Sequence, residues 1–220
     1  GQNLQQFMSD SPWSGPKVFS QIQDTIRERP LFQTGAVVIL DESADEKAGE
    51  NSAGTARQYN GHLAKVDVCQ VATCLAYAHP ASGTWALVDG ELFVPKVWFT
   101  KAYAVRRHEV GLPAERQFLT KPELGLQMIQ RAQANHLPFD LVACDTLYGR
   151  NQAFRAALDE LHIQYAAQVP ADCQVYLQSP KVGVPRKRNR RGQRLKKLKV
   201  LSRQQPREVR RLVNSQVTVW

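Results

Sequence analysis

Apolar residues near the start of the chain recur at helical spacing, at Val18, Phe19, Ile22 and Ile26. Ser11 or Ser14 ahead of them can accept hydrogen bonds from the free amides of a first turn, and Pro12 or Pro16 suits that turn. Pro30 cannot continue a helix. The pattern therefore predicts a serine-capped helix that ends before Pro30.

Two short apolar runs farther along the chain each lead into an aspartate. Residues 36–40 read Ala-Val-Val-Ile-Leu and precede Asp41, while residues 141–144 read Leu-Val-Ala-Cys and precede Asp145. Short apolar runs without alternation are typical of strands that are buried on both faces. We therefore expect Asp41 and Asp145 at the ends of two buried strands.

The region between these runs predicts more strands and a second helix. Residues 43–61 are polar and rich in glycine, residues 66–78 read as a strand, and residues 83–94 alternate around a turn-like Asp89-Gly90. Two or three antiparallel strands in a meander fit this pattern. The sequence Thr120-Lys121-Pro122-Glu123 predicts the capped start of a helix.

The order of elements indicates an α/β domain with a mixed sheet. After Asp145, Tyr148-Gly149-Arg150 turns the chain into a predicted helix that carries Phe154, Ala157, Leu158 and Leu161. Residues 165–169 predict a strand that Pro170 stops. From residue 180 onward Gly, Pro and basic residues dominate, which favours a domain boundary there. We expect a core over residues 1–180 and a basic insertion or tail over residues 181–220.

Length and composition favour a globular protein. The chain has 220 residues and 43% hydrophobic content, which is enough for a core. It contains neither a long uncharged apolar run nor the layout of a signal peptide, so we expect a cytoplasmic protein with no membrane partner. The four cysteines lack the spacing of a zinc site and are expected to be buried free thiols.

The net charge of +9 is concentrated at the end of the chain. Residues 181–220 carry 14 Lys and Arg against one acid, Glu208. Such a segment is either a disordered solvated tail or a surface for a polyanion, of which nucleic acid is the common one. Without interleaved aromatic residues it can neutralise phosphates but has little means to stack on bases. Its candidate DNA-binding residues are Arg186, Lys187, Arg188, Arg190, Arg191, Arg194, Lys196 and Lys197.

Asp41 and Asp145 are the strongest candidates for chemistry. An acid at the end of a buried strand is held by the sheet while its carboxylate faces solvent, and two such acids converge if their strands are neighbours. Hard oxygen ligands of this kind hold Mg²⁺ or Mn²⁺. Each acid could instead cap the turn or helix that follows it. Glu42, beside Asp41 on an extended backbone, points to the opposite face and is expected to support the structure.

Three further cations are candidates for phosphate contacts. Arg57 lies in the glycine-rich stretch, where a turn that only packs Tyr59 is an alternative. Lys65 could assist the same surface or be solvated. Arg150 could contact a phosphate or a carboxylate. Lys121 could belong to the site or be a residue of the first helical turn.

Several blocks of the sequence together resemble the DDE transposases of bacterial insertion sequences. They are Ser9-Asp10-Ser11-Pro12-Trp13, residues 38–43, residues 54–61, Cys69-Gln70-Val71 with residues 75–78, residues 120–124, and Cys144-Asp145-Thr146-Leu147-Tyr148-Gly149-Arg150. The resemblance implies an RNase H-like fold and a metal-bound triad of Asp, Asp and Glu, with Asp41 as the first acid and Asp145 as the second. It also implies Mg²⁺ or Mn²⁺ as cofactor, double-stranded DNA as partner, cleavage and transfer of strands at transposon ends, and a homo-oligomer in the synaptic complex.

The chain departs from this family at the third acid. The family has a Glu on a late helix in a segment rich in Tyr and Trp, and no segment after Asp145 matches it. Glu160 comes too early, and Glu208 lacks the aromatic context. We therefore expect a transposase truncated before its third acid. The alternatives are a catalytically inactive DNA-binding remnant and a nuclease of the same fold.

Overall fold

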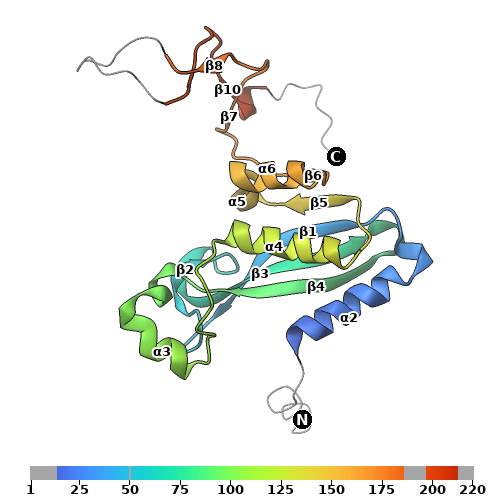
Figure 1. Cartoon of the computed structure of the whole chain (residues 1–220), viewed down its shortest axis with the longest axis vertical. Helices are drawn as coiled ribbons and strands as arrows, with labels where there is room; N and C mark the ends of the chain where they lie inside the picture. The colour runs from blue at the N-terminus through green and yellow to red at the C-terminus, as the bar shows by residue number, and fades with distance from the viewer. Residues whose placement is uncertain (1–13, 50, 186–196, 213–220) are drawn as a thin grey trace. The chain divides into compact units, whose positions relative to one another are not determined.

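The computed structural model describes residues 14–49, 51–185 and 197–212. The chain forms two compact units, Gly1–Gln168 and Val169–Trp220 (Figure 1). Compactness alone does not define a folding domain, so the boundary expected near residue 180 stays a prediction. The first unit contains the main sheet and carries the candidate site.

Helices and strands alternate along the first unit. Its helices are α2 (Gly15–Arg27), α3 (Ala104–Glu109), α4 (Lys121–Ala134), α5 (Thr146–Gly149) and α6 (Gln152–Glu160). Its strands are β1 (Val37–Glu46), β2 (Ala56–Asn60), β3 (Lys65–His79), β4 (Thr84–Phe93), β5 (Leu141–Cys144) and β6 (Tyr165–Ala167). The predicted strand over residues 141–144 is confirmed with the same bounds.

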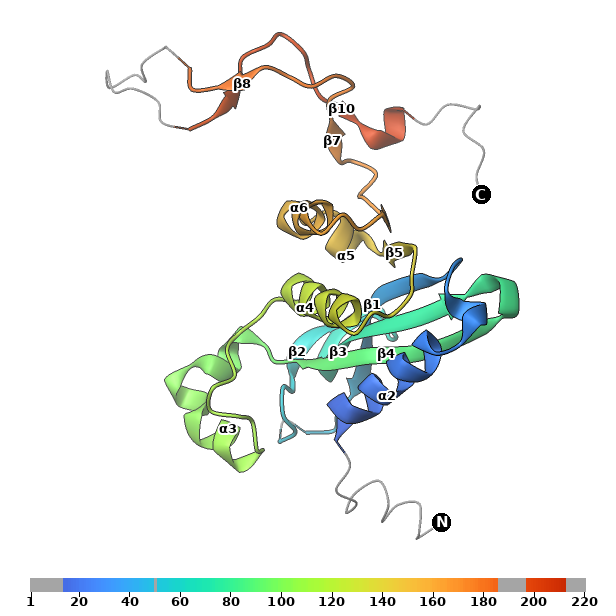
Figure 2. The same cartoon turned by 45° about the vertical axis from the view of Figure 1, so that its right-hand side comes forward.

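These six strands form one mixed sheet in the order β2-β3-β1-β5-β6, with β4 also paired to β3. β3 is antiparallel to β1, β2 and β4, whereas β1–β5 and β5–β6 are parallel pairs. Figure 2 shows the long strands β3 and β4 side by side and α4 lying across the sheet. This mixed sheet with flanking helices is that of an RNase H-like α/β fold, so the predicted fold class is confirmed.

The core lies on one face of the sheet. Side chains that alternate along β1 and β3, such as Leu40 and Leu75, are fully buried and pack with Met128 of α4 and Leu158 of α6. The other face is apolar but exposed, with Ile39 at 41% and Trp85 at 78% of full exposure. The prediction that the first strand is buried on both faces is therefore wrong for the described residues.

Long-range pairing lengthens the strands beyond what their apolar runs indicate. β1 continues past Asp41 to Glu46 because its backbone pairs with β3 as far as Cys69. Residues 56–60, expected in a polar loop, form β2 against the start of β3. Asp89-Gly90 lies inside β4, so the predicted turn there is wrong. The chain turns instead at Pro80–Ser82 and Gly83, whose φ of 65° suits glycine.

The two long helices begin differently. α2 follows Ser14 with a proline in its first turn, but the Ser14 side chain makes no capping bond, contrary to that option of the prediction. Ser11 and Pro12 lie outside the described residues. α4 has the predicted capping box, in which Thr120 Oγ1 accepts from the Glu123 amide at 3.4 Å and Glu123 Oε2 accepts from the Thr120 amide at 2.7 Å.

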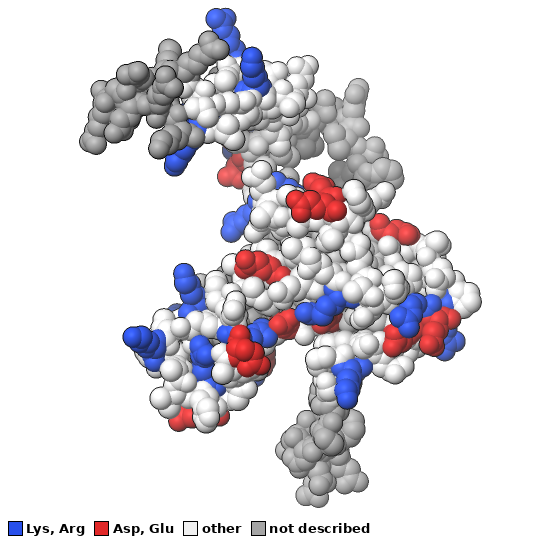
Figure 3. Space-filling model, viewed as in Figure 1, with Lys and Arg blue, Asp and Glu red and all other residues white. Residues whose placement is uncertain are grey.

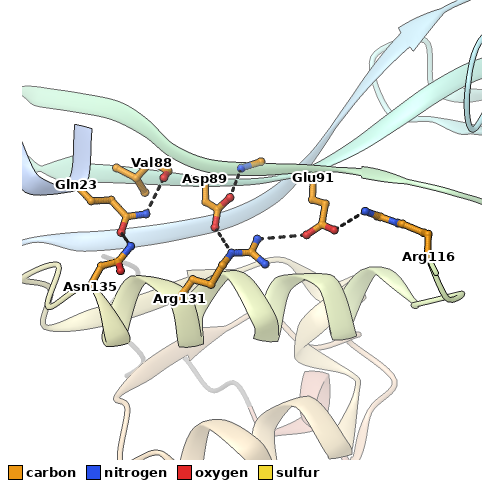
Figure 4. A network of polar contacts seen from close by, with 8 residues as sticks. Gln23, Val88, Asp89, Glu91, Arg116, Arg131 and Asn135 are labelled. Atoms are coloured by element: carbon orange, nitrogen blue, oxygen red, sulfur yellow. Dashed lines mark hydrogen bonds and ion pairs between the residues drawn. The ribbon is translucent and has the colours of Figure 1, made fainter. Parts of the chain in front are cut away.

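A network of polar contacts attaches α4 to β4 (Figure 4). Arg131 Nε lies 2.9 Å from Asp89 Oδ2, and its Nη2 lies 3.2 Å from Glu91 Oε2. Arg116, in the segment before α4, places Nη1 2.7 Å from Glu91 Oε1. The network continues to α2 through Gln23, Val88 and Asn135. These contacts fix the position of α4 on the sheet, and its first residue is Lys121.

The second unit contains short antiparallel pairs. β7 (Gln174–Val175) pairs with β10 (Arg207–Glu208), and β8 (Val182–Gly183) pairs with β9 (Lys199–Val200). Across the described ranges of both units, no helix is long and apolar enough to cross a membrane.

Candidate functional site

Sheet register brings Asp41 and Asp145 together. Leu40 in β1 and Cys144 in β5 are partners in the parallel pair, and the two aspartates are the next residues. Neighbouring strands lie about 4.8 Å apart. Both aspartates line the same polar cavity of about 440 Å³, which Glu42, Tyr59 and Lys121 also line. They also line a second cavity of about 530 Å³ beside β6.

One oxygen of each carboxylate is used locally. Asp41 Oδ1 accepts from the Glu42 amide at 2.8 Å, and Asp145 Oδ1 accepts from the Leu147 amide at 2.9 Å as the N-cap of α5. In the described part of the chain, the second oxygen of each has no hydrogen-bond partner. The capping role of Asp145 therefore leaves one of its oxygens available to a cation.

Gly149 allows α5 to lie close to the end of β6. A Cβ at this position would collide with the backbone carbonyl of Gln168. Because α5 starts directly after Asp145, this close packing also fixes the direction of the Asp145 side chain. Only glycine, which has no Cβ, therefore fits between Tyr148 and Arg150.

Glu42 points to the core side of the sheet, as predicted from its place next to Asp41. Its carboxylate lies 3.7 Å from Lys121 Nζ, and its Oε1 is buried together with the hydroxyls of Thr73 and Tyr148. Burial raises the pKa of Glu42, Asp145 and Asp41 raise it further, and Lys121 opposes them. Burial also raises the pKa of Tyr148. Glu42, Lys121 and Tyr148 therefore support the candidate site from the core side of the sheet.

The predicted phosphate-binding cations lie at two places on the first unit. Arg57 is exposed in β2, a strand rather than the expected loop. Lys65 Nζ lies 2.6 Å from Asp67 Oδ2, and this ion pair raises the pKa of Lys65. Arg150 is exposed directly after α5 and lines a different cavity from the aspartates. Arg57 and Lys65 therefore lie near the same carboxylate, that of Asp67, whereas Arg150 lies at a different cavity.

Most of the predicted basic tract lies outside the described residues. This applies to Arg186, Lys187, Arg188, Arg190, Arg191, Arg194 and Lys196. Lys197 is described and exposed. The role of the tract in DNA binding stays a prediction.

Cysteines and acids elsewhere do not extend the site. The four cysteines are free, with Cys69 and Cys144 buried, and burial raises the pKa of Cys144 to about 11. Glu160 is exposed at the end of α6, and Glu208 of the second unit pairs with Arg210 and Arg211. Residues 14–49, 51–185 and 197–212 contain no group of three His, Cys, Asp or Glu that could hold a metal.

A family model described as "DDE superfamily endonuclease" matches residues 1–219. The chain belongs to this family. A curated relative, the probable transposase for insertion sequence element IS701 of Microchaete diplosiphon, is 29% identical over 173 residues. The match covers 76% of this chain and 40% of the relative, so the chain spans about two fifths of that protein's length. The resemblance to DDE transposases is thereby confirmed at the level of the family.

Sequence patterns missed two features of this member of the family. One is the contact of Glu42 with Lys121 and Tyr148, which depends on pairing between distant strands. The other is an aromatic cavity between Phe93 and Phe118. The spacing of residues along the sequence gave no signal for this cavity, because its residues come from separate elements. Lys121, which the family resemblance had included, takes part in the Glu42 contact and also lines the cavity.

Proposed function

We propose that this chain is the part of a DNA transposase that holds the first two metal-binding acids and acts in cleavage and transfer of DNA strands. The observation that carries the proposal is the pairing of Leu40 with Cys144, which brings Asp41 and Asp145 to one polar cavity in a chain of the DDE superfamily endonuclease family. Double-stranded DNA is the proposed substrate.

The donor set of the cavity fits a divalent cation. Asp41 and Asp145 each offer a carboxylate oxygen without a hydrogen-bond partner among the described residues, and hard oxygen donors suit Mg²⁺ or Mn²⁺. When bound, such an ion activates an attacking water or hydroxyl and stabilises the leaving oxygen at phosphorus. Asp41 and Asp145 would hold it, while Glu42 fixes Lys121 on the core side.

Cations of the first unit would then position the DNA backbone. The side chains of Arg57 and Tyr59 lie on the same exposed face of β2, and Tyr59 lines the cavity of the aspartates. Arg150 lies five residues beyond Asp145, on the other side of α5. Together with the basic tract of residues 186–197, these residues offer phosphate contacts without reading the sequence.

A second candidate function is that of a catalytically inactive DNA-binding remnant. It is favoured by the finding that no third acid joins Asp41 and Asp145 among the described residues. The two functions differ in metal binding, because a remnant has no need to keep a cation between its two carboxylates.

Calorimetric titration of the 220-residue chain with Mn²⁺ tests the proposal. We expect saturable binding that Asp145→Asn abolishes. Asparagine is also a good N-cap, so this variant should keep α5 in place. Asp159→Asn, at an exposed position of α6, is the matched control and should bind Mn²⁺ like the wild type. Absence of Mn²⁺ binding by the wild type, or an unchanged titration of Asp145→Asn, would reject the metal site.

A further inference from the structure

A cavity of about 520 Å³ opens beside the candidate metal site, within the size range of about 300–1,000 Å³ for small-molecule pockets. Its apolar part comes from Phe93 at the end of β4, Phe118 in the segment before α4, Pro122, and Leu147 of α5. The rings of Phe93 and Phe118 meet edge to face, with centroids 6.5 Å apart. We call it the aromatic cavity.

Cations border the aromatic cavity. Lys121 and Arg150 line it, and none of its lining residues is acidic. Lys121 Nζ lies 5.5 Å from the centroid of the Phe93 ring. Beyond it, Arg107 Cζ lies 5.4 Å from the centroid of the Phe99 ring, and Phe99 meets Phe118 edge to face. Figure 3 shows further Lys and Arg side chains around α3, with a few acids among them.

Lys121 connects this cavity to the aspartates. It lines both the aromatic cavity and the cavity of Asp41 and Asp145. Its side chain is only 19% exposed and is held by Glu42 on one side and Phe93 on the other. A half-buried ammonium group at this junction can bind a phosphate that joins one nucleotide in each cavity.

The combination of aromatic rings and cations without acids is the chemistry that binds single-stranded nucleic acid. Bases stack on the rings, and the cations contact the phosphates on either side. The cavity between α2 and β4 differs in this respect, because Asp89 and Glu91 line it and are already paired with Arg131. Arg116 also lines it and is paired with Glu91, so the charges of this cavity are already balanced within the protein.

We propose that the aromatic cavity binds one unpaired nucleotide of the DNA, adjacent to the phosphate at Asp41 and Asp145. A base inside a duplex is covered by its stacked neighbours, so only an unpaired base can enter the cavity. The inference rests on the proposed function, since it places the nucleotide next to the bond that is cut. It adds a base-binding subsite to a site otherwise made of carboxylates and phosphate contacts.

Fluorescence anisotropy of the 220-residue chain tests the subsite with three labelled probes. The first is a blunt duplex, the second has a single-stranded overhang, and the third has the same overhang made of abasic nucleotides. The second and third probes carry equal charge and differ only in their bases. We expect the natural overhang to bind about five- to 150-fold more tightly than the abasic one, the gain that stacking of one base on an aromatic side chain provides.

Variants locate the effect. Phe118→Leu keeps an apolar side chain but removes the ring. The ratio of the affinities for the natural and the abasic overhang should therefore fall towards one. Trp85→Leu, which removes an exposed aromatic from the open face of the sheet, is the control and should keep the preference. Arg150→Gln, at an exposed position, should weaken both overhang probes equally. A further measurement needs no variant. A 2-aminopurine in the overhang should lose fluorescence when the wild-type chain binds, because the base then stacks on the aromatic rings.

The outcomes separate the two proposals. Equal affinity for natural and abasic overhangs, with normal binding of the blunt duplex, would overturn the subsite and leave the proposed function intact. Loss of the preference in Trp85→Leu but not in Phe118→Leu would also overturn it. Binding of none of the probes would overturn both proposals together. Unchanged 2-aminopurine fluorescence on bound DNA would show that the base stays outside the cavity.

Discussion

Leu40 of β1 and Cys144 of β5 are register partners in a parallel pair, and the next residue in each segment is an aspartate. The sheet therefore holds the carboxylates of Asp41 and Asp145 near each other at one cavity. Two like charges on neighbouring strands repel each other unless a cation lies between them. The arrangement costs stability in exchange for a site.

Asp41→Asn should therefore be more stable than the wild type when no divalent cation is present. We expect a gain of less than about 1 kcal/mol, because Asp41 is exposed and solvent screens the repulsion. Urea denaturation measures it. Mn²⁺ should raise the stability of the wild type but not of the variant. Asp45→Asn, on the same strand but paired with Lys47, is the control and should show no gain. A variant less stable than the wild type would contradict the repulsion.

The 220-residue chain should cleave DNA poorly on its own. Two carboxylates can hold one cation, but they leave a second cation and the leaving group poorly fixed. Nicking of supercoiled plasmid in Mg²⁺ measures the activity. Robust nicking would contradict the expected absence of a third acid, and its loss in Glu160→Gln or Glu208→Gln would then identify the substitute.

The basic segment should dominate binding to duplex DNA. Residues 181–220 have 14 cations against one acid, enough for half a dozen phosphate contacts. With that many contacts, raising the salt from low to moderate concentration should lower the affinity by about a thousandfold, because each contact releases counterions. Deletion of residues 181–203 should flatten this salt dependence while the sheet of the first unit stays folded. Anisotropy of a blunt duplex across a salt series compares the two chains. Equal slopes would place the DNA surface near Arg57, Lys65 and Arg150 instead.

The capping box of α4 should make stability depend on pH. Hydrogen bonds from the Thr120 side chain and amide lower the pKa of Glu123 in the folded state. Its charge therefore stabilises the fold above the ordinary pKa of 4.5, and the contribution is lost as the pH falls through the lowered value. Glu123→Gln should be less stable than the wild type by about 0.3–1 kcal/mol at pH 7 and equal to it in acid.

Denaturation at several pH values measures this difference. Glu115→Gln, at an exposed position in the segment before α4, is the control and should differ little from the wild type at any pH. A deficit of Glu123→Gln that stays constant down to pH 3 would show that the carboxylate charge does not contribute.

Local signals in the sequence determined the elements that depend on neighbouring residues. The apolar run of residues 141–144 gave β5 with its bounds, and Thr120 with Glu123 gave the start of α4, because strand propensity and capping act within a few residues. Their place after such runs singled out Asp41 and Asp145, and the family resemblance implied that they are the first and second acids. These signals were sufficient for the fold class.

Only the tertiary structure decided what those elements meet. β1 extends past Asp41, and β4 runs through Asp89-Gly90, because β3 supplies backbone partners that no local pattern contains. The register of Leu40 with Cys144, the contact of Lys121 with Glu42 and the approach of Phe93 to Phe118 join segments far apart in the sequence. Such contacts depend on which strands pair and where a helix packs, and these are properties of the whole fold rather than of any window of residues.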